Sequence, residues 1–230
     1  MGAQIAGYVM LAGAAAAMVI GAIGLFGARL RWVVTYSAVL QAGYAALALA
    51  ASLLTGNGAG YSAAVFQVIA GACGVALMWI AAQALIPHTG DSLPLRGDAT
   101  PRSGEAASLR GTGASPPAWA VFSMVVACMS LVGLPPMAGL PAKIAVIHAS
   151  LRAPGVLFLA GLGATALGAL SLWVYAGIVL PLIAGGAAKG PASATIRLRV
   201  LVDALVAVLI GLGLAPYIGF AIGAAFTGGR

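Results

Sequence analysis

The sequence predicts an all-α, polytopic membrane protein with six transmembrane helices, the fourth of which is discontinuous. The first observation is composition: the 230 residues are 62% hydrophobic and only 7% charged, with a mean hydropathy of +1.09. Soluble domains do not have this composition, whereas helical membrane proteins do. The second observation is that six apolar segments are each long enough to cross about 30 Å of hydrocarbon. The third is a pair of adjacent prolines inside one of these segments.

The predicted spans lie near 5–27, 33–54, 63–86, 119–150, 155–184 and 200–226. About 20 residues suffice for one span, and the fourth and fifth segments exceed that length. In the fourth, the excess fits a helix interrupted at Pro135-Pro136, because proline has no backbone N–H and disrupts a helix. The polar segment 87–117 has the composition of a solvated loop. We therefore expect residues 1–230 to form a single membrane domain.

The basic residues predict the orientation of the chain. The connections after spans one, three and five hold eight basic residues, whereas the opposite side, including both termini, holds only Arg152 and Arg230. Basic residues accumulate on the inner side of a membrane. Both termini are therefore expected on the outer side, which agrees with an even number of spans.

The sequence contains no motif for a bound cofactor. Neither a phosphate-binding glycine loop, nor a dinucleotide fingerprint, nor a CxxC pair or an HExxH sequence is present. Cys73 and Cys128 lie in apolar segments, where cysteine behaves as a small hydrophobic residue. No basic cluster with interleaved aromatic residues occurs, so nucleic acid is not an expected partner, and lipids are.

Lys143 is the strongest candidate for a functional residue, because it lies deep inside the fourth span. A lysine at the bilayer centre costs about 2.5–3.5 kcal/mol on insertion scales and usually serves a function. Loss of water disfavours the charged ammonium, which suits a group that takes up and releases a proton. The alternative is a lysine that extends to the interface, a role that Arg152 fits better because it lies closer to the end of the span.

The predicted helix break consists of glycine and proline residues immediately before Lys143: Gly133, Pro135, Pro136, Gly139 and Pro141. A broken helix frees carbonyl groups, which need a polar or protein-lined environment, and such breaks mark ion sites in transporters. A structural kink without ion contact is the alternative. His148 follows Lys143 by five residues, about 140° around a helix, so it does not share its face. It is either a second relay or a histidine satisfied at the helix end.

Two polar stripes lie on other spans. Ser37, Gln41 and Tyr44 follow at i, i+4 and i+7 on the second span, and Ser171 and Tyr175 are four residues apart on the fifth. Polar residues in membrane helices often hydrogen-bond to neighbouring helices. These five side chains are therefore expected to join helices or to line a hydrated channel.

Two of these segments resemble a known family. The second span contains Thr35-Tyr-Ser-Ala-Val-Leu-Gln-Ala-Gly-Tyr44, similar to the AYSSIAHAGY signature of the antiporter-like subunits of respiratory complex I. The fourth contains Ser130-Leu-Val-Gly-Leu-Pro-Pro-Met-Ala-Gly-Leu-Pro-Ala-Lys143, which resembles SLAGIPPLAGFFGK of subunit 2, the N-type subunit. The order and spacing of the two motifs match the family as well.

The resemblance implies that the chain corresponds to the last six helices of fourteen-helix proteins. Spans one to five would form the second of two inverted repeats, and span six the terminal helix. Lys143 would be the last lysine of the central hydrophilic axis. Gln41 stands where the family has histidine, and Leu140-Pro141 replaces an aromatic pair and is expected to add a further break. The first repeat has no counterpart, so we expect a separate chain to supply it.

The function that follows is that of a non-redox, proton-translocating subunit of NADH:ubiquinone oxidoreductase, complex I. NADH, FMN, iron–sulfur clusters and quinone would then bind to partner subunits. The membrane would be energy-transducing: the mitochondrial inner membrane is the first expectation, and a bacterial plasma membrane is the alternative. The Ala/Gly-rich composition suits an imported, nuclear-encoded subunit, and a GC-rich bacterial genome explains it equally well. Two alternatives remain: a stand-alone small cation/proton antiporter, and a structural membrane subunit without transport.

Overall fold

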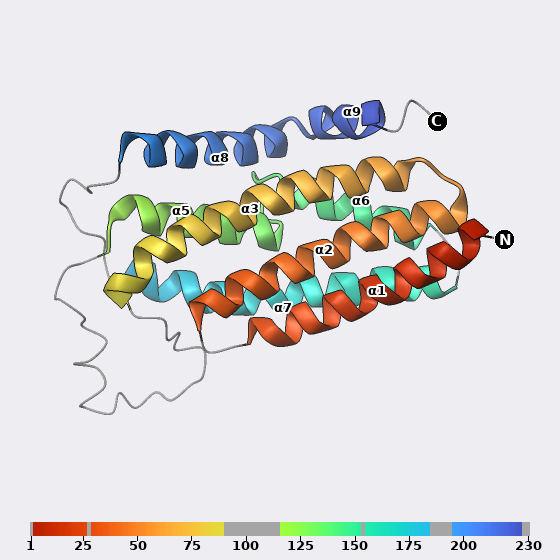
Figure 1. Ribbon diagram of the computed structural model, residues 1–230, viewed down its shortest axis with the longest axis horizontal. Helices are drawn as coiled ribbons and strands as arrows, with labels where there is room; N and C mark the ends of the chain where they lie inside the picture. The colour runs from red at the N-terminus through yellow and green to blue at the C-terminus, as the bar shows by residue number, and fades with distance from the viewer. Residues whose placement is uncertain (1, 27–28, 90–115, 153–154, 185–194, 227–230) are drawn as a thin grey trace.

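The computed structural model describes residues 2–26, 29–89, 116–152, 155–184 and 195–226, and within them the regular structure is helical, with no strand. The helices lie side by side along a common direction and form an elongated bundle (Figure 1). In that view α2 (Leu30–Thr55) and α3 (Ala59–Thr89) cross the middle of the bundle, and α1 (Gly2–Leu25) lies below them. Above them lie α8 (Ile196–Leu214) and α9 (Pro216–Phe226). The expected all-α fold is therefore confirmed.

Four helices of the described part are long and apolar enough to cross a membrane by themselves. These four helices are α1 (Gly2–Leu25), α2 (Leu30–Thr55), α3 (Ala59–Thr89) and α7 (Val156–Ala184). Along the chain, α1, α2 and α3 are consecutive and each runs antiparallel to the one before it (Figure 1). Helix α2 ends at Gly56, whose positive φ of 70° suits a left-handed helix end. Helix α3 extends past Pro87 into the segment that was expected to be loop, and residues 90–115 lie outside the described part.

The expected fourth span is divided into two shorter apolar helices, α5 (Ala118–Val132) and α6 (Gly139–Leu151). At about 1.5 Å per residue they are about 22 Å and 20 Å long, so neither alone matches the hydrocarbon thickness. They follow one another along the bundle behind α3 (Figure 1). Residues 133–138 between them are not helical.

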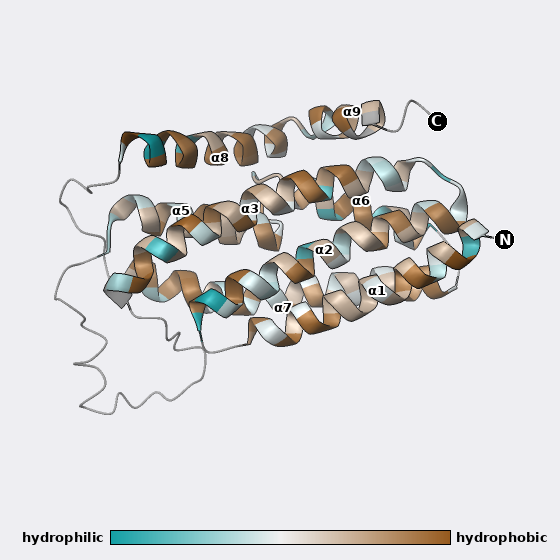
Figure 2. Ribbon diagram, viewed as in Figure 1, coloured by the Kyte–Doolittle hydropathy of each residue, from teal (hydrophilic) through white to brown (hydrophobic). Residues whose placement is uncertain are grey.

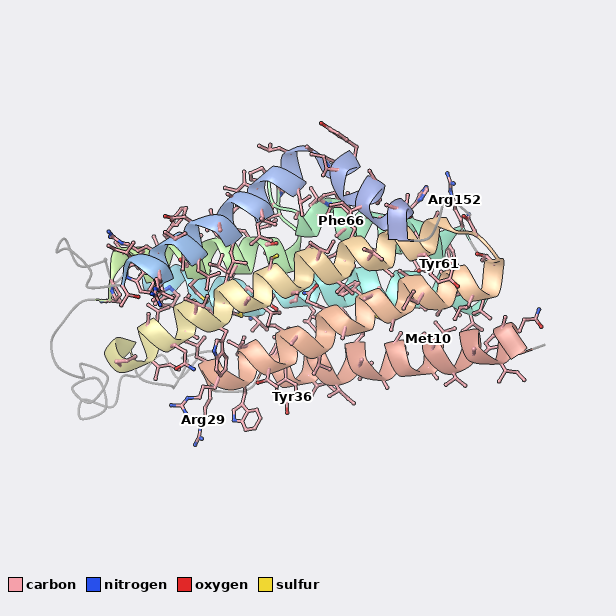
Figure 3. All side chains as sticks on the ribbon, turned by 45° about the horizontal axis from the view of Figure 1, so that its top comes forward. Met10, Arg29, Tyr36, Tyr61, Phe66 and Arg152 are labelled. Atoms are coloured by element: carbon pink, nitrogen blue, oxygen red, sulfur yellow. The ribbon has the colours of Figure 1, made fainter. Side chains whose placement is uncertain are left out.

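The expected sixth span, 200–226, is also divided into two helices, so the prediction of one continuous helix was wrong there. Helix α8 (Ile196–Leu214) and helix α9 (Pro216–Phe226) meet at an angle of 98°. The reason is Pro216, which lacks a backbone N–H and disfavours the helical conformation at the preceding residue. Ala215 accordingly has φ −124° and ψ 64°. Figure 3 shows the chain turning at this point. With the bent pair counted as one span, the described residues hold up to five candidate spans.

The surface of the bundle is apolar and its interior holds several polar side chains. Large apolar residues are exposed along α1 and α7, such as Ile23, Leu159 and Trp173, and Figure 2 shows hydrophobic residues along the lengths of the helices. This pattern is that of a lipid-facing surface. In contrast, the buried polar residues lie within the bundle: Ser37, Gln41, Ser52, Gln67, Ser123, Ser130, Lys143, Ser150 and Ser171.

The described part of the chain starts and finishes at the same end of the bundle. Helix α1 begins there and α9 ends there (Figure 1). Arg29 and Arg152 lie at opposite ends, as Figure 3 shows. Arg29 therefore lies at the end of the bundle opposite to the start of α1 and the finish of α9.

Candidate functional site

The break between α5 and α6 leaves two carbonyl groups without backbone partners at the end of α5. Gly133 has a φ of 90°, and its N–H donates to the carbonyls of Met129 (3.0 Å) and Ser130 (3.1 Å), while the N–H of Leu134 donates to Met129 (2.9 Å). This is the Schellman helix end, in which a left-handed glycine lets the chain turn back. The motif provides backbone donors for the carbonyls of Met129 and Ser130. It leaves the carbonyls of the next two residues, Leu131 and Val132, without a backbone donor.

The amine of Lys143 donates hydrogen bonds to both of these carbonyls. Its Nζ donates to the carbonyl oxygen of Leu131 and, at 3.0 Å, to that of Val132. The side chain extends from α6 and is only 6% exposed. An ammonium group at the C-terminal end of a helix also interacts favourably with the helix dipole. The break in the helix and the buried lysine therefore form one structural unit, in which the freed carbonyls replace water around the amine.

Tyr44 completes the surroundings of the amine. The Lys143 Nζ lies 4.9 Å from the centroid of the Tyr44 ring, within range of a cation–π interaction. The Tyr44 hydroxyl donates to the carbonyl of Ala164 on α7 at 2.6 Å, which fixes the ring. Among the described residues only Asp203 is acidic, and it is exposed on α8. Within that part of the chain, carbonyl oxygens and a ring face stabilise the amine instead of a carboxylate.

Two close backbone approaches hold the break in place. A Cβ on Gly139 would collide with the carbonyl of Ser130, and one on Gly213 would collide with the backbone of Pro136 and Met137. Glycine at these positions lets α5, α6 and α8 pack without a side chain between them. The N–H of Ala138 also donates to the carbonyl of Leu209 on α8 at 2.8 Å. The non-helical segment is thus bonded to another helix, and the peptide bond Pro135-Pro136 within it is cis.

A glutamine pair connects this site to α3. Gln41 Nε2 donates to the carbonyl of Leu131 at 3.2 Å, and Gln67 Nε2 donates to Gln41 Oε1 at 2.7 Å. The Leu131 carbonyl therefore accepts from both Gln41 and Lys143. Gln67 was not among the expected site residues, although an amide within an apolar span carries the same signal as Gln41 does.

The two expected polar stripes meet at one hydrogen bond. Ser37 Oγ and Tyr175 Oη are 2.7 Å apart, and Ser37 Oγ also lies 2.7 Å from the carbonyl of Val33. Ser171 instead donates to Gly168 on its own helix at 2.7 Å. Ser37, Gln41, Tyr44 and Tyr175 therefore join different helices, and Ser171 does not.

Pro141 lies in the first turn of α6, and His148 lies in its last turn. The expectation that Pro141 adds a second break was wrong: Pro141 lies in the first turn of α6, where the missing N–H has no helical partner to lose. His148 is exposed in the last turn of α6. It lines, with Pro141 and Arg152, a cavity of about 690 Å³ between α2, α3, α6 and α9. The structure thus brings Lys143, Gln41 and Tyr44 together and leaves His148 on another face.

The site is chemically suited to an amine that changes its protonation state. A neutral amine keeps two N–H donors, which matches the two carbonyl acceptors, so the hydrogen bonds persist in both protonation states.

Cys128 is buried, Cys73 is half-buried, and both are free thiols. No group of three or more metal-ligating side chains occurs within the described ranges.

Comparison with known proteins identifies the family. Residues 1–168 match the family described as NADH:quinone oxidoreductase/Mrp antiporter, transmembrane. The match covers most of the chain, and the chain belongs to this family of antiporter-like membrane subunits. As expected from the two motifs, it is a multi-pass membrane protein of the complex I and Mrp group.

Individual relatives agree with this assignment. Subunit N of the NADH-quinone oxidoreductase of Geotalea uraniireducens (strain Rf4) is 28% identical over 190 residues, 82% of this chain and 36% of that protein. The Mrp complex of Dietzia sp. DQ12-45-1b has a chain with a TM-score of 0.69 at 20% identity, which covers 95% of this chain and 47% of that one. Respiratory complex I of Thermus thermophilus, with bound Aureothin, has one with a TM-score of 0.59 at 26% identity, covering 93% and 45%. The chain spans less than half the length of these relatives.

Proposed function

We propose that this chain is the proton-translocating second repeat of an N-type antiporter-like subunit, subunit 2, of NADH:quinone oxidoreductase. Lys143 would take up and release the proton. The observation that carries the proposal is the buried Lys143 amine at the end of α5, bonded to the carbonyls of Leu131 and Val132. Buried ionisable groups at broken membrane helices mark ion pathways.

In this proposal α5 and α6 together form one discontinuous span, and α8 with α9 forms the sixth. The combined length of α5 and α6 supports this, because each helix alone is shorter than the hydrocarbon core. Six spans agree with the two chain ends at one end of the bundle (Figure 1). The orientation follows from the basic residues, with the Arg29 end inside and both termini outside.

The partners would be the other membrane subunits of the complex and a separate chain that supplies the first repeat. The chain spans 36% and 45% of the length of two of its relatives. Redox chemistry, with its NADH, FMN, iron–sulfur clusters and quinone, would belong to other subunits. The role of His148 would be to exchange protons with water in the cavity beside Arg152, because the histidine is exposed there.

A second candidate is a subunit of an Mrp-type antiporter, because the family description names both assemblies. Purification from native membranes with mild detergent separates the two. Co-purification with NADH-oxidising and quinone-binding subunits supports the complex I proposal. Isolation with other antiporter subunits alone, or as a homo-oligomer, would contradict it and leave an antiporter.

A further inference from the structure

The cavity between α2, α3, α6 and α9 changes from polar to apolar along its length. Its polar end is lined by Arg152, His148 and Asn57. Figure 3 shows Arg152 at the end of the bundle where α3 begins. Deeper in the bundle the lining is apolar and includes Pro141 and Phe220. Since Pro141 and Arg152 are about 16 Å apart along α6, the cavity extends from the end of the bundle towards its middle.

The cavity is open towards the hydrocarbon of the membrane. Ile144 lines it and is 56% exposed, and the nearby helix α9 exposes Ile218 and Ile222. An opening between exposed aliphatic side chains of a membrane-spanning bundle faces lipid chains rather than water. The volume of about 690 Å³ lies in the range of ligand pockets, about 300–1,000 Å³. A molecule that fills this cavity therefore needs an apolar part that can enter from the membrane.

The polar end of the cavity favours an anion. Arg152 is exposed there, and its guanidinium has the geometry that binds phosphate in a bidentate manner. Asp203 is the single acidic residue in the described part of the chain, and it lies on α8, outside the lining. Asn57 Oδ1 accepts from the N–H of Ala59 at 2.9 Å, so the amide nitrogen of Asn57 is the group that can donate to a ligand. His148 offers a further ring N–H.

We propose that this cavity binds one anionic phospholipid. The phosphate lies at Arg152, His148 and Asn57, and one acyl chain follows α6 towards Pro141. A free phosphate ion would occupy the polar end and leave the apolar end unfilled. A zwitterionic lipid carries its own cation next to the phosphate, so it neutralises Arg152 less well. A phospholipid with a net negative charge is the ligand that matches both ends of the cavity.

The lipid is compatible with the proposed function and goes beyond it. The phosphate lies at the hydrated level of the headgroups, so water still reaches His148. Lys143 is buried and does not line the cavity. Lipid binding therefore does not depend on proton translocation by Lys143, and each proposal can fail without the other.

Photo-crosslinking with lipid probes tests the proposal. The full chain in phosphatidylcholine nanodiscs receives a trace of phosphatidylglycerol that carries a diazirine in one acyl chain, and mass spectrometry maps the crosslinked peptides. A phosphatidylcholine probe with the same acyl chains serves as reference. We expect the phosphatidylglycerol probe to label the cavity-lining parts of α6 and α9 about fivefold more than the reference, the factor that one arginine contributes near an anionic headgroup. Both probes should label the exposed face of α7 equally.

Two pairs of variants separate the phosphate from the acyl chain. Arg152→Gln should lower labelling of the cavity by phosphatidylglycerol about fivefold, to the level of the reference. Arg29→Gln removes an exposed arginine at the opposite end of the bundle and should leave this labelling unchanged. Ala145→Phe fills part of the apolar lining and should lower labelling of the cavity by both probes. Ala166→Phe, on the exposed face of α7, is its control and should have no effect there.

Other occupants of the cavity give different results. Equal labelling of the cavity by both probes, or phosphatidylglycerol labelling that does not depend on Arg152, would show bulk lipid and overturn the proposal. Competition by added inorganic phosphate would show that a free anion binds instead. Labelling of α7 without labelling of the cavity by either probe would show that no lipid enters, and would overturn the proposal as well.

Discussion

The glutamine pair makes a quantitative prediction for stability. Gln41 participates in two interhelical hydrogen bonds, to Leu131 and to Gln67, whereas Gln67 makes only the second of them. Side-chain hydrogen bonds between membrane helices contribute about 0.6 kcal/mol on average and up to about 1.7 kcal/mol. Gln41→Leu should therefore destabilise the fold by about 1–3 kcal/mol, and Gln67→Leu by about 0.6–1.7 kcal/mol.

The double variant should be no less stable than Gln41→Leu alone, because that substitution already removes both bonds. The expected non-additivity equals the energy of the shared Gln41–Gln67 bond, which a double-mutant cycle isolates. The assay is reversible unfolding of the purified full chain in mixed micelles by increasing SDS. Gln83→Leu, on the exposed surface of α3, should change stability by less than about 0.5 kcal/mol. Destabilisations that simply add in the double variant would refute the network.

Three further predictions follow from the packing and the topology. Gly139→Ala should destabilise the chain by about 1–3 kcal/mol, because the added Cβ meets the carbonyl of Ser130; Gly163→Ala, with open space around it, should be neutral in the same SDS unfolding assay. Tyr44→Phe should cost about 0.6–1.7 kcal/mol for the lost hydroxyl bond, and Tyr44→Leu a further 0.5–2 kcal/mol or so for the ring over the amine; equal losses would show that the ring contributes nothing. In sealed, right-side-out vesicles, an impermeant thiol reagent should label Gln4→Cys and not Arg31→Cys, and the reverse pattern would invert the topology.

The sequence was sufficient to predict helices, membrane location and family, because these depend on composition, segment length and local motifs. It also led to Lys143, since a lysine in an apolar span stands out against its neighbours. Pro216 was overlooked because its segment is apolar on both sides, so hydropathy alone joined two helices that meet at 98°. Pro141 was misjudged for the opposite reason: a proline in the first turn of a helix disrupts nothing.

The contacts of the site could not be obtained from sequence, because they depend on which helices pack together. Periodicity placed Ser37, Gln41 and Tyr44 on one face of a helix, but not opposite Tyr175, Leu131 and Ala164. The main ligands of the Lys143 amine are backbone carbonyls, which no residue pattern identifies. Their availability follows from the Schellman end at Gly133, whose left-handed conformation became evident only in the structure.

The ratio of protons translocated per electron, measured with the intact complex in proteoliposomes, tests the role of Lys143 most directly. Lys143→Arg keeps a permanent charge and enough N–H donors for the carbonyls of Leu131 and Val132, but arginine does not release its proton. If Lys143 exchanges protons, Lys143→Arg and Lys143→Ala should both lower the ratio while the complex remains assembled. If Lys143→Arg translocates protons like the parent protein, the lysine only caps α5 and the account is contradicted.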